Sequence, residues 1–466
     1  MINFDNSYAR LPAHFYAKQT PVPVAKPEFF ARNQDLAAEI GLGPIDVDDA
    51  AYFGGNKIPQ GATPIAQAYS GHQFGGWSPQ LGDGRAILLG EIITPQGERR
   101  DVHLKGSGRT PFSRGGDGRA WLGPVMREYL VSEAMHALGV PTTRALAAVT
   151  TGETVVRDTP LPGAILTRVA ASHIRVGTFQ FFAGRGDLDA LGLLRDHVME
   201  RHYPDASDTV ALYKAIIEKQ AKLIAKWMSV GFIHGVMNTD NMSISGETID
   251  YGPCAFMDDY QSGKVFSSID RNSRYAYNRQ ADMGIWNLAQ LGTALLPLMG
   301  EDTDAMIEVA TAALHEFPDI FQTEWDRLFL RKIGIDDAQD GDKDRVVAFL
   351  KILEQTGSDF SNSFAALATD TPETLLPRSS EMTTWLSDWR DRVTDPVTVL
   401  QATNPAVIPR NHKVEEALQA GEGGNFNPFH DLLHAVEKPY MDGDHFLSYQ
   451  APPEPSEKVL QTFCGT

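Results

Sequence analysis

Cysteines and long apolar runs are scarce in this chain. Its 466 residues include two cysteines, Cys254 and Cys464, which excludes a scaffold built from disulfides and favours a reducing, cytoplasmic environment. No stretch approaches the roughly 18 uninterrupted apolar residues of a transmembrane helix. The N-terminal segment MINFDNSYARLPAHFYAKQT has an early acid and no apolar core, so we expect neither a signal peptide nor a membrane partner.

Positive charge is also in deficit. Lysine and arginine number 41 against 60 aspartates and glutamates, which gives a net charge of −19. Such an acidic surface repels phosphodiesters, so no nucleic-acid partner is expected. Hydrophobic residues make up 42% of the chain, enough to form a large globular core. We therefore expect a soluble, monomeric protein of several lobes.

Strand patterns precede helical patterns along the chain. The segments Arg85–Thr94 and Asp101–Lys105 have the apolar runs and alternation that are typical of strands. Apolar residues at helical spacing then predict helices over Gly123–Leu138 and Ser207–Val230, and residues 280–400 are mostly helical in pattern. This order predicts an α+β fold with two lobes and a helical extension.

Glycine-rich segments accumulate before the first expected helix. One of them, Gly82-Asp83-Gly84-Arg85, stands directly before a strand pattern, where glycines would let backbone N–H groups approach a phosphate. Lys105 ends the next strand and could hold phosphate oxygens as a point charge. Glu128, on the following helix, could pair with it. Taken singly, these features are more often a turn and two solvent-exposed charges.

A segment with the chemistry of a metal site follows the second helix. It runs His234-Gly-Val-Met-Asn-Thr-Asp240-Asn241, and Asp250 follows an expected hairpin of sequence MSISGETI. Asp and Asn oxygens are ligands that Mg²⁺ prefers, together with phosphate oxygens. Because a hairpin would bring Asn241 and Asp250 face to face, we expect them to bind Mg²⁺ or Mn²⁺.

The order of these elements is that of the protein kinases. A glycine loop, a strand lysine, a helix glutamate, a histidine-containing loop ending in Asn and an Asp-x-Gly follow one another. One position departs from that pattern, because Val236 stands where a kinase has its catalytic aspartate. A valine cannot accept a proton. Either the site is inactive, or Asp240 beside Asn241 serves as the base.

The kinase-like order divides the chain into four regions. Residues 1–61 are expected to form an N-terminal arm packed on the core, and residues 62–155 a β-rich N-lobe with glycine-rich nucleotide loops. Residues 156–300 would form a helical C-lobe with the catalytic and metal loops. Residues 301–466 would form a helical C-terminal extension and tail. The predicted architecture is a kinase-like, two-lobed α+β fold with additions at both ends.

Arginines gather near these motifs although the chain is acidic. They are Arg85, Arg109, Arg114, Arg119, Arg168 and Arg175. A kinase needs few of them, but nucleotidyl transfer expels pyrophosphate, whose charge guanidinium groups would stabilise. The pattern therefore favours ATP bound in the opposite sense from a kinase's, with its γ-phosphate inside. About half of these arginines could instead pair with surface acids.

Several long motifs are specific enough to suggest a family. They include YSGHQFGGWSPQLGDGR, HLKGSGRTPFSRGGDGRAWL, TRVAASHIRVGTFQ and GFIHGVMNTDNMSISGETIDYGPCAF. From about residue 5 to the C-terminus, the chain resembles the selenoprotein O family of kinase-like protein adenylyltransferases. The resemblance implies a kinase-like fold, ATP in a flipped orientation, and transfer of AMP to Ser, Thr or Tyr hydroxyls of proteins.

The resemblance also assigns residues position by position. The positions that it implies for nucleotide binding are Gly82, Gly84, Arg85, Lys105, Asp117, Gly118, Arg168, Arg175 and Asp250. It makes Glu128 the partner of Lys105 and Asp240 the proton acceptor. Asn241 and Asp250 become the metal ligands. Some members carry selenocysteine near the C-terminus, where this chain has Cys464.

Two further features have structural alternatives. Cys254 lies close to Asp250, and Cys464 lies near the chain end, so we hypothesise a reversible disulfide that pins the tail near the site; two unrelated thiols fit equally well. His430 and His434 have the spacing of a zinc-binding helix, but the sequence has no glutamate after His430 and no evident third ligand. We interpret them as residues of a structural helix.

Three alternative functions stay open beside adenylyl transfer. The chain could use UTP with Mn²⁺ for uridylyl transfer, because base selectivity depends on a pocket shape that the sequence does not give. It could be a small-molecule phosphotransferase, against which Val236 argues. It could also be a non-catalytic nucleotide-binding scaffold, against which Asp240 beside an intact metal pair argues.

Overall fold

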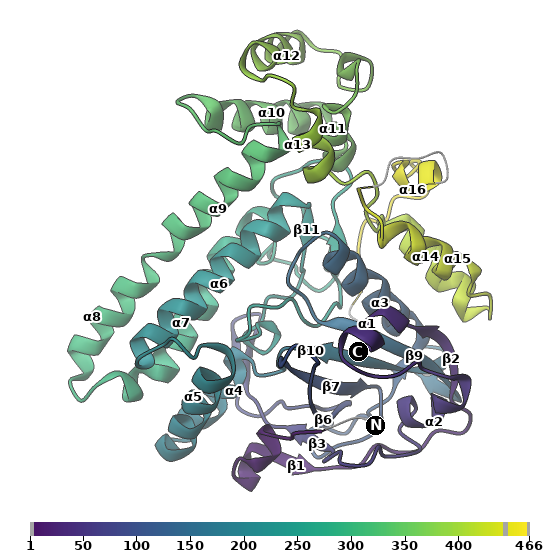
Figure 1. The fold of residues 1–466 in the computed structure, drawn as a ribbon, viewed down its shortest axis with the longest axis vertical. Helices are drawn as coiled ribbons and strands as arrows, with labels where there is room; N and C mark the ends of the chain where they lie inside the picture. Colours follow the sequence, from purple (N-terminus) through teal and green to yellow (C-terminus); the bar gives the residue numbers. More distant parts are fainter. Residues whose placement is uncertain (1–3, 441–445, 464–466) are drawn as a thin grey trace.

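The computed structural model describes residues 4–440 and 446–463. Its centre is an antiparallel sheet with strand order β1-β3-β6-β7-β10-β9-β2, and β8 pairs with β10. Helices follow the sheet and extend away from it (Figure 1). The strands are β1 (Tyr16–Lys18), β2 (Glu28–Arg32), β3 (Ile65–Gln67), β6 (Ala86–Ile93), β7 (Arg99–Lys105), β8 (Ala120–Trp121), β9 (Arg144–Val156) and β10 (Pro160–Ala170). The fold is α+β, as the sequence predicts.

Register within the sheet brings cationic side chains together. The expected strands over residues 85–94 and 101–105 are present as β6 and β7, and Ala86 lies opposite Lys105. On the other side of β7, Leu166 lies opposite Lys105 and Arg168 opposite His103. The end of β7 therefore lies between the glycine loop before β6 and the Arg168 side chain of β10.

The sheet does not end at the predicted region boundaries. The N-terminal arm contributes β1 and β2, which are the two edge strands. Strand β10 lies beyond residue 155, yet it pairs with both β7 and β9. The reason is that β9 and β10 form a long hairpin, and the predicted boundary after residue 155 falls just before its turn.

The helix α3 (Leu122–Ala137) packs on the sheet and is almost wholly buried. Its buried face contacts β9 and β10, and α14 (Asn411–Glu422) and α15 (Asn427–Val436) cover another side. Figure 1 shows these two C-terminal helices beside α3. Part of the expected C-terminal extension thus returns to the sheet half of the molecule. A shared apolar cluster joins them, with Tyr129 of α3 edge-on to Phe429 of α15.

Long helices make up the second half of the fold. The helix expected over residues 207–230 is α6, which Asp208 caps through the backbone N–H of Ala211. It packs against α7, α8 and α9, and its buried apolar positions recur at helical spacing. These helices are α4 (Val176–Ala183), α5 (Leu188–His202), α6 (Thr209–Ser229), α7 (Gln280–Met299), α8 (Thr303–Leu314) and α9 (Phe317–Lys332).

Seven further α-helices lie in the described ranges. They are α1 (Gln34–Glu39), α2 (Ala50–Phe53), α10 (Asp342–Thr356), α11 (Phe360–Ala366), α12 (Ser380–Arg392), α13 (Val397–Thr403) and α16 (Leu447–Gln450). Helices α10 to α13 form a separate group at the far end of α9 (Figure 1). None of the helices in the described ranges is long and apolar enough to cross a membrane.

The prediction of a hairpin over MSISGETI is wrong. Ser243 forms a bridge with Arg175, and Thr248 forms one with Thr142, so the segment pairs with other parts of the chain instead of with itself. Its side chains are mostly buried, and burial on two sides favours these outside partners for its backbone. The remaining strands are β4 (Gly71–Gln73) with β5 (Gly76–Ser78), and β11 (Phe232–Ile233) with β12 (Ala255–Phe256).

Candidate active site

One cavity collects the residues that the sequence singles out. Its volume is about 660 Å³, and it lies between the glycine loops, the strands β7 and β10, and the segment that carries the expected base. The predicted site residues that line it are Gly82, Gly84, Arg85, Lys105, Asp117, Gly118, Arg168, Arg175, Asp240, Asn241 and Asp250. Glu128 lies behind this wall. The structure thus gathers residues that lie as much as 168 positions apart in the chain.

Asp250 is the centre of a cluster of positive charge. Arg168 donates to its Oδ1 and Arg175 to its Oδ2, both at 2.9 Å, and the Lys105 ammonium lies 3.6 Å from Oδ1. Burial raises the pKa of Asp250, but the Coulomb attraction of these three cations outweighs it and holds the pKa well below its usual range. The carboxylate is therefore ionised at neutral pH.

Glu128 links the lysine and one arginine from behind. It accepts hydrogen bonds from Lys105 and, at 3.2 Å, from Arg168. The glutamate side chain is 2% exposed. It lies on α3 and contacts Lys105 at the end of β7. Paired in this way, the two cations are held in position before any ligand binds.

A buried histidine supports Arg168 from the opposite side. The guanidinium lies 3.0 Å from Nδ1 of His103, and Nε2 of that ring lies 3.4 Å from Asp83. Because a guanidinium can only donate, Nδ1 accepts and the ring proton is on Nε2. Burial, followed by the charge of Arg168, lowers the pKa of His103, which agrees with a neutral ring.

The glycine loops require their glycines. Gly82 has φ +90°, and a Cβ there would lie 2.4 Å from the Phe112 ring. Gly118 has φ +69°, and its Cβ would lie 2.2 Å from the backbone of Gly108. Neighbouring Asp117 pairs with Arg157 at 2.8 Å. Arg109, one of the arginines noted in the sequence, does not line this cavity: it donates to the carbonyls of Gly115 and Gly116 and so fixes the loop.

Asp240 is a buried carboxylate with a raised pKa. It lies in the short helix η4 (Thr239–Asn241) and is 7% exposed. Burial raises its pKa to about 6, although the hydrogen bond from Gln73 and the charge of Arg175 lower it. Gln73 donates to Oδ2 at 3.0 Å, and among the described residues Oδ1 has no hydrogen-bond partner. Asp240 thus lines the cavity with one buried oxygen that has no hydrogen-bond partner among the described residues.

The donor set beside Asp240 suits a hard divalent cation. Asn241 donates its amide N–H to the carbonyl of Val236 at 3.0 Å, so its amide oxygen is the atom left for a ligand. With the ionised carboxylate of Asp250, it offers the oxygen chemistry that Mg²⁺ and Mn²⁺ prefer. The oxygen chemistry of these two residues agrees with a metal-binding role, and in this structure both oxygens of Asp250 accept hydrogen bonds from Arg168 and Arg175. Their role as metal ligands stays a prediction.

Several residues of the site were missed by sequence reasoning. Gln73 and Phe74 lie on the β4–β5 hairpin, Arg157 follows β9, and Tyr69 lies under the Arg175 guanidinium at 4.4 Å. All four line the cavity. The motif YSGHQFGG contains three of them, and its glycines were the available signal. Nothing local in the sequence shows that this motif folds onto η4.

A family profile with the description protein adenylyltransferase SelO matches residues 1–437. The chain belongs to the SelO family. Similar proteins named protein nucleotidyltransferase YdiU occur in Jannaschia sp. (strain CCS1), 55% identical over 475 residues that cover 99% of both chains, and in Ruegeria pomeroyi, 54% identical over 469 residues that cover 100% of this chain and 99% of the relative. This SelO chain is therefore an enzyme of the nucleotidyltransferase class.

Of the two cysteines in the predicted pair, Cys254 lies within the described residues. Cys254 is buried, and burial raises the pKa of its thiol to about 12. Close by, Thr462 of the C-terminal segment donates its hydroxyl to the carbonyl of Pro253 at 2.6 Å. Cys464 lies outside the described residues. The disulfide therefore stays a prediction.

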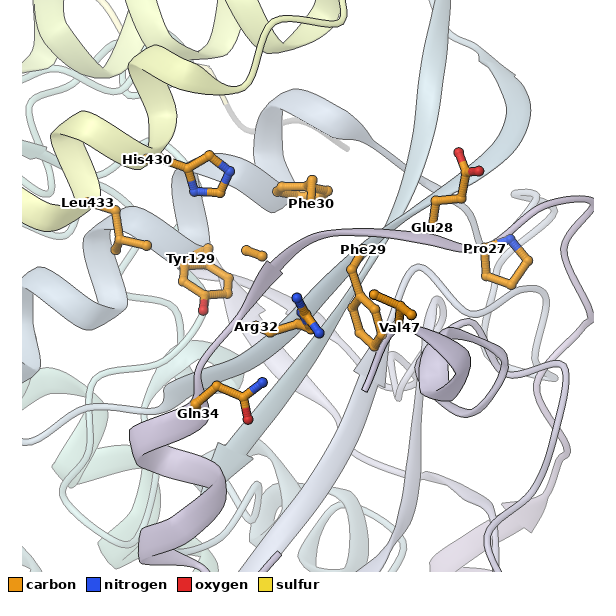
Figure 2. Close-up of a pocket in the computed structure, with 11 residues that line it drawn as sticks. Pro27, Glu28, Phe29, Phe30, Arg32, Gln34, Val47, Tyr129, His430 and Leu433 are labelled. Atoms are coloured by element: carbon orange, nitrogen blue, oxygen red, sulfur yellow. The ribbon is translucent and has the colours of Figure 1, made fainter. Parts of the chain in front are cut away.

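A second cavity, of about 730 Å³, lies between β2 and α15. Figure 2 shows His430 and Leu433 of α15 on one side, and Phe29, Arg32 and Gln34 on the other. It contains none of the predicted nucleotide or metal residues. In the described parts of the SelO chain, no group of three or more His, Cys, Asp or Glu side chains could hold a metal ion.

Proposed function

We propose that this chain transfers AMP from ATP to Ser, Thr or Tyr hydroxyls of proteins and releases pyrophosphate. The observation that carries the proposal is the distribution of charge in the cavity. Lys105, Arg168 and Arg175 surround Asp250, whereas Asp240 lines the cavity with one buried oxygen that has no hydrogen-bond partner among the described residues. The family supports a nucleotidyl transfer. In it, the cations would stabilise the charge of the phosphates, and Asp240 would act as the base.

The cations support a nucleotide whose terminal phosphates enter first. Lys105, Arg168 and Arg175 all line the cavity. Glu128 and His103 hold Lys105 and Arg168 in position. Arg175 donates to Asp250 and to the carbonyl of Asp240. Fixed positive groups in a water-poor site stabilise a leaving group that gains negative charge, and pyrophosphate is such a group. The proposal requires the α-phosphorus to lie within reach of Asp240. The sheet half and the helical half would correspond to the two lobes of a kinase-like enzyme.

In this mechanism Asp240 accepts the proton of the acceptor hydroxyl. The hydroxyl oxygen attacks the α-phosphorus, the bond from the α-phosphorus to the bridging oxygen breaks, and pyrophosphate leaves toward the arginines. Val236 lines the same cavity but cannot take a proton. The raised pKa of Asp240, which also lines the cavity, supports it as the proton acceptor. Asn241 and Asp250 would hold a Mg²⁺ or Mn²⁺ ion, which would neutralise phosphate charge when bound.

A second candidate function is uridylyl transfer from UTP with Mn²⁺. The contacts that support the first proposal involve phosphates and an acceptor, and they would serve either nucleotide equally. Phosphoryl transfer to a small molecule is less well supported, since it would leave the buried arginines without a task. A scaffold without catalysis is opposed by the raised pKa of Asp240, because strongly perturbed carboxyls in clefts are typical of catalytic sites.

Product analysis tests the proposed function. The purified chain is incubated with Mg²⁺, ATP and a cell lysate, and the small-molecule products are separated. Pyrophosphate released in step with adenylylated protein supports the proposal, and ADP released in step with phosphorylated protein contradicts it. The same reaction with UTP and Mn²⁺, run in competition with ATP, decides between the two nucleotides.

A further inference from the structure

The tip of the β4–β5 hairpin has an unusual residue. Phe74 and Gly75 connect the two strands, and both have positive φ, +51° and +83°. A two-residue turn of this kind strongly prefers Asn-Gly or Asp-Gly. A bulky side chain in the left-handed region is sterically unfavourable, because its Cβ lies too close to the backbone. Backbone strain of this sort often accompanies a function.

Packing does not account for the phenylalanine. Its side chain remains partly open, with 38% of the residue exposed, and it meets the Tyr275 ring edge-on at a centroid distance of 5.1 Å. It also lines the cavity that contains Asp240. An exposed aromatic ring at the mouth of a charged site is the kind of surface that partners contact.

Hydrogen bonds fix the hairpin to the segment that contains Asp240, the proposed base. The N–H of His72 donates to Thr239 at 2.7 Å, Gln73 donates to Asp240, and the N–H of Phe74 donates to Asn238 at 3.0 Å. Three consecutive hairpin residues thus bind three consecutive residues of the catalytic segment. The Phe74 ring is therefore held at a constant position relative to Asp240.

A second exposed apolar residue lines the same cavity. Ile269 lies in the turn before Asp270 and is 52% exposed. Among the large apolar residues of the described ranges that are this exposed, Phe74 and Ile269 are the two that line this cavity. The rest of the wall is rich in glycine, arginine and aspartate, which suit phosphates.

We propose that Phe74 and Ile269 form the docking surface for the acceptor segment of the protein substrate, and that they contact an apolar side chain next to the modified hydroxyl residue. The inference rests on the proposed function. The occupant follows from continuity: an acceptor hydroxyl that reaches Asp240 brings its neighbouring residues to the cavity mouth, where these side chains lie. The charged wall is taken by the triphosphate, so the apolar surface is left for the protein.

Peptide labelling tests this surface. The probe is a peptide library with a central Ser, Thr or Tyr and one flanking position fixed at a time, labelled with α-labelled ATP and Mg²⁺. Wild-type protein is expected to prefer Leu, Ile or Phe at a flanking position over Asp or Lys. Phe74→Asn should abolish this preference and raise the KM for peptide about tenfold, with the KM for ATP unchanged.

The variants are chosen so that folding does not confuse the result. Asparagine is the residue that this turn prefers, so Phe74→Asn should keep or raise the melting temperature. Phe74→Leu keeps an apolar side chain and should retain the flanking preference, and Ile269→Ser should repeat the effect of Phe74→Asn from a different loop. Leu375→Asn is the control, because Leu375 is exposed and lies outside this cavity.

Each result has a distinct meaning. Unchanged peptide KM and preference in both Phe74→Asn and Ile269→Ser, with active wild type, would overturn the docking surface alone. A higher KM for ATP with an unchanged KM for peptide would also overturn it, because Phe74 and Ile269 would then contact the adenine of ATP and not the peptide. If the wild type transferred no α-label to any peptide or lysate protein, the proposed function itself would fail.

Discussion

Gln73 donates a hydrogen bond from Nε2 to Oδ2 of Asp240 at 3.0 Å, across 167 positions of the sequence. This contact orients a carboxylate that is otherwise held by burial alone, because Oδ1 has no partner among the described residues. The glutamine therefore decides how the proposed base presents its lone pairs to an acceptor.

Gln73→Met tests this relationship. Methionine has a similar length but donates no hydrogen bond, so the Asp240 carboxylate should lose its fixed orientation. We expect kcat to fall about tenfold, which corresponds to the roughly 1.4 kcal/mol of one such hydrogen bond. The KM for ATP should not change, since Gln73 does not contact the cation cluster. A variant with wild-type kcat would show that Asp240 needs no orientation by Gln73.

Gly71→Ala tests the same carboxylate from another side. A Cβ at this position would lie 2.6 Å from Oδ1 of Asp240, so the aspartate must move and its bond to Gln73 should break. Steady-state kinetics should show a loss of kcat at least as large as that of Gln73→Met. Gly43→Ala is the matched control, because nothing lies within 4 Å of its Cβ. Full activity of Gly71→Ala would place the base elsewhere.

The acidity of Asp240 predicts a pH profile. A base must be deprotonated to act, and burial raises the pKa of this carboxyl to about 6. The rate of transfer at saturating ATP should therefore rise with pH through about 6 and level off above it. The residual rate of Asp240→Asn should lack this step. A wild-type profile that is flat between pH 5 and 7 would contradict the assignment (a window of about one unit on either side of the pKa).

The same shift predicts a change in stability. Because the pKa is higher in the folded than in the unfolded state, the folded state binds the proton more tightly, and stability falls as pH rises from about 4 to about 6. Asp240→Asn removes this cost. At pH 8 the free energy of unfolding should increase by up to about 3 kcal/mol, measured by urea unfolding, while transfer is lost. An unchanged or lower unfolding free energy would argue against the raised pKa.

Local patterns in the sequence were enough to predict the α+β class and to single out Gly82 and Lys105, which line the cavity around Asp250. Other lining residues, such as Asp117 and Gly118, were predicted from the family resemblance. Gly82 lies in the turn before β6 and Lys105 ends β7, and glycines and period-two patterns give direct signals for such positions. Long-range pairing was not predictable in the same way. The segment after Asn241 was expected to form a hairpin, but Ser243 pairs with Arg175 instead, because tertiary partners compete with local ones.

The β4–β5 hairpin, which packs on the segment around Asp240, shows the same limit. Its sequence, GHQFGGWS, contains turn glycines but no charge or periodicity that points to Asp240. Only the fold brings Gln73 and Phe74 to the site. The edge strand β2 is a similar case, since its pairing with β9 joins residues more than a hundred positions apart, and loop closure of that length leaves no local trace.

The most direct test of the account is paired labelling with ATP that carries its label in either the α- or the γ-phosphate. Wild-type protein and Asp250→Ala are each incubated with Mg²⁺ and a cell lysate, and protein-bound label is measured. The account predicts label from the α position alone with the wild type, and none with Asp250→Ala. Label from the γ position would contradict it, because the chain would then be a kinase with ATP in the ordinary orientation.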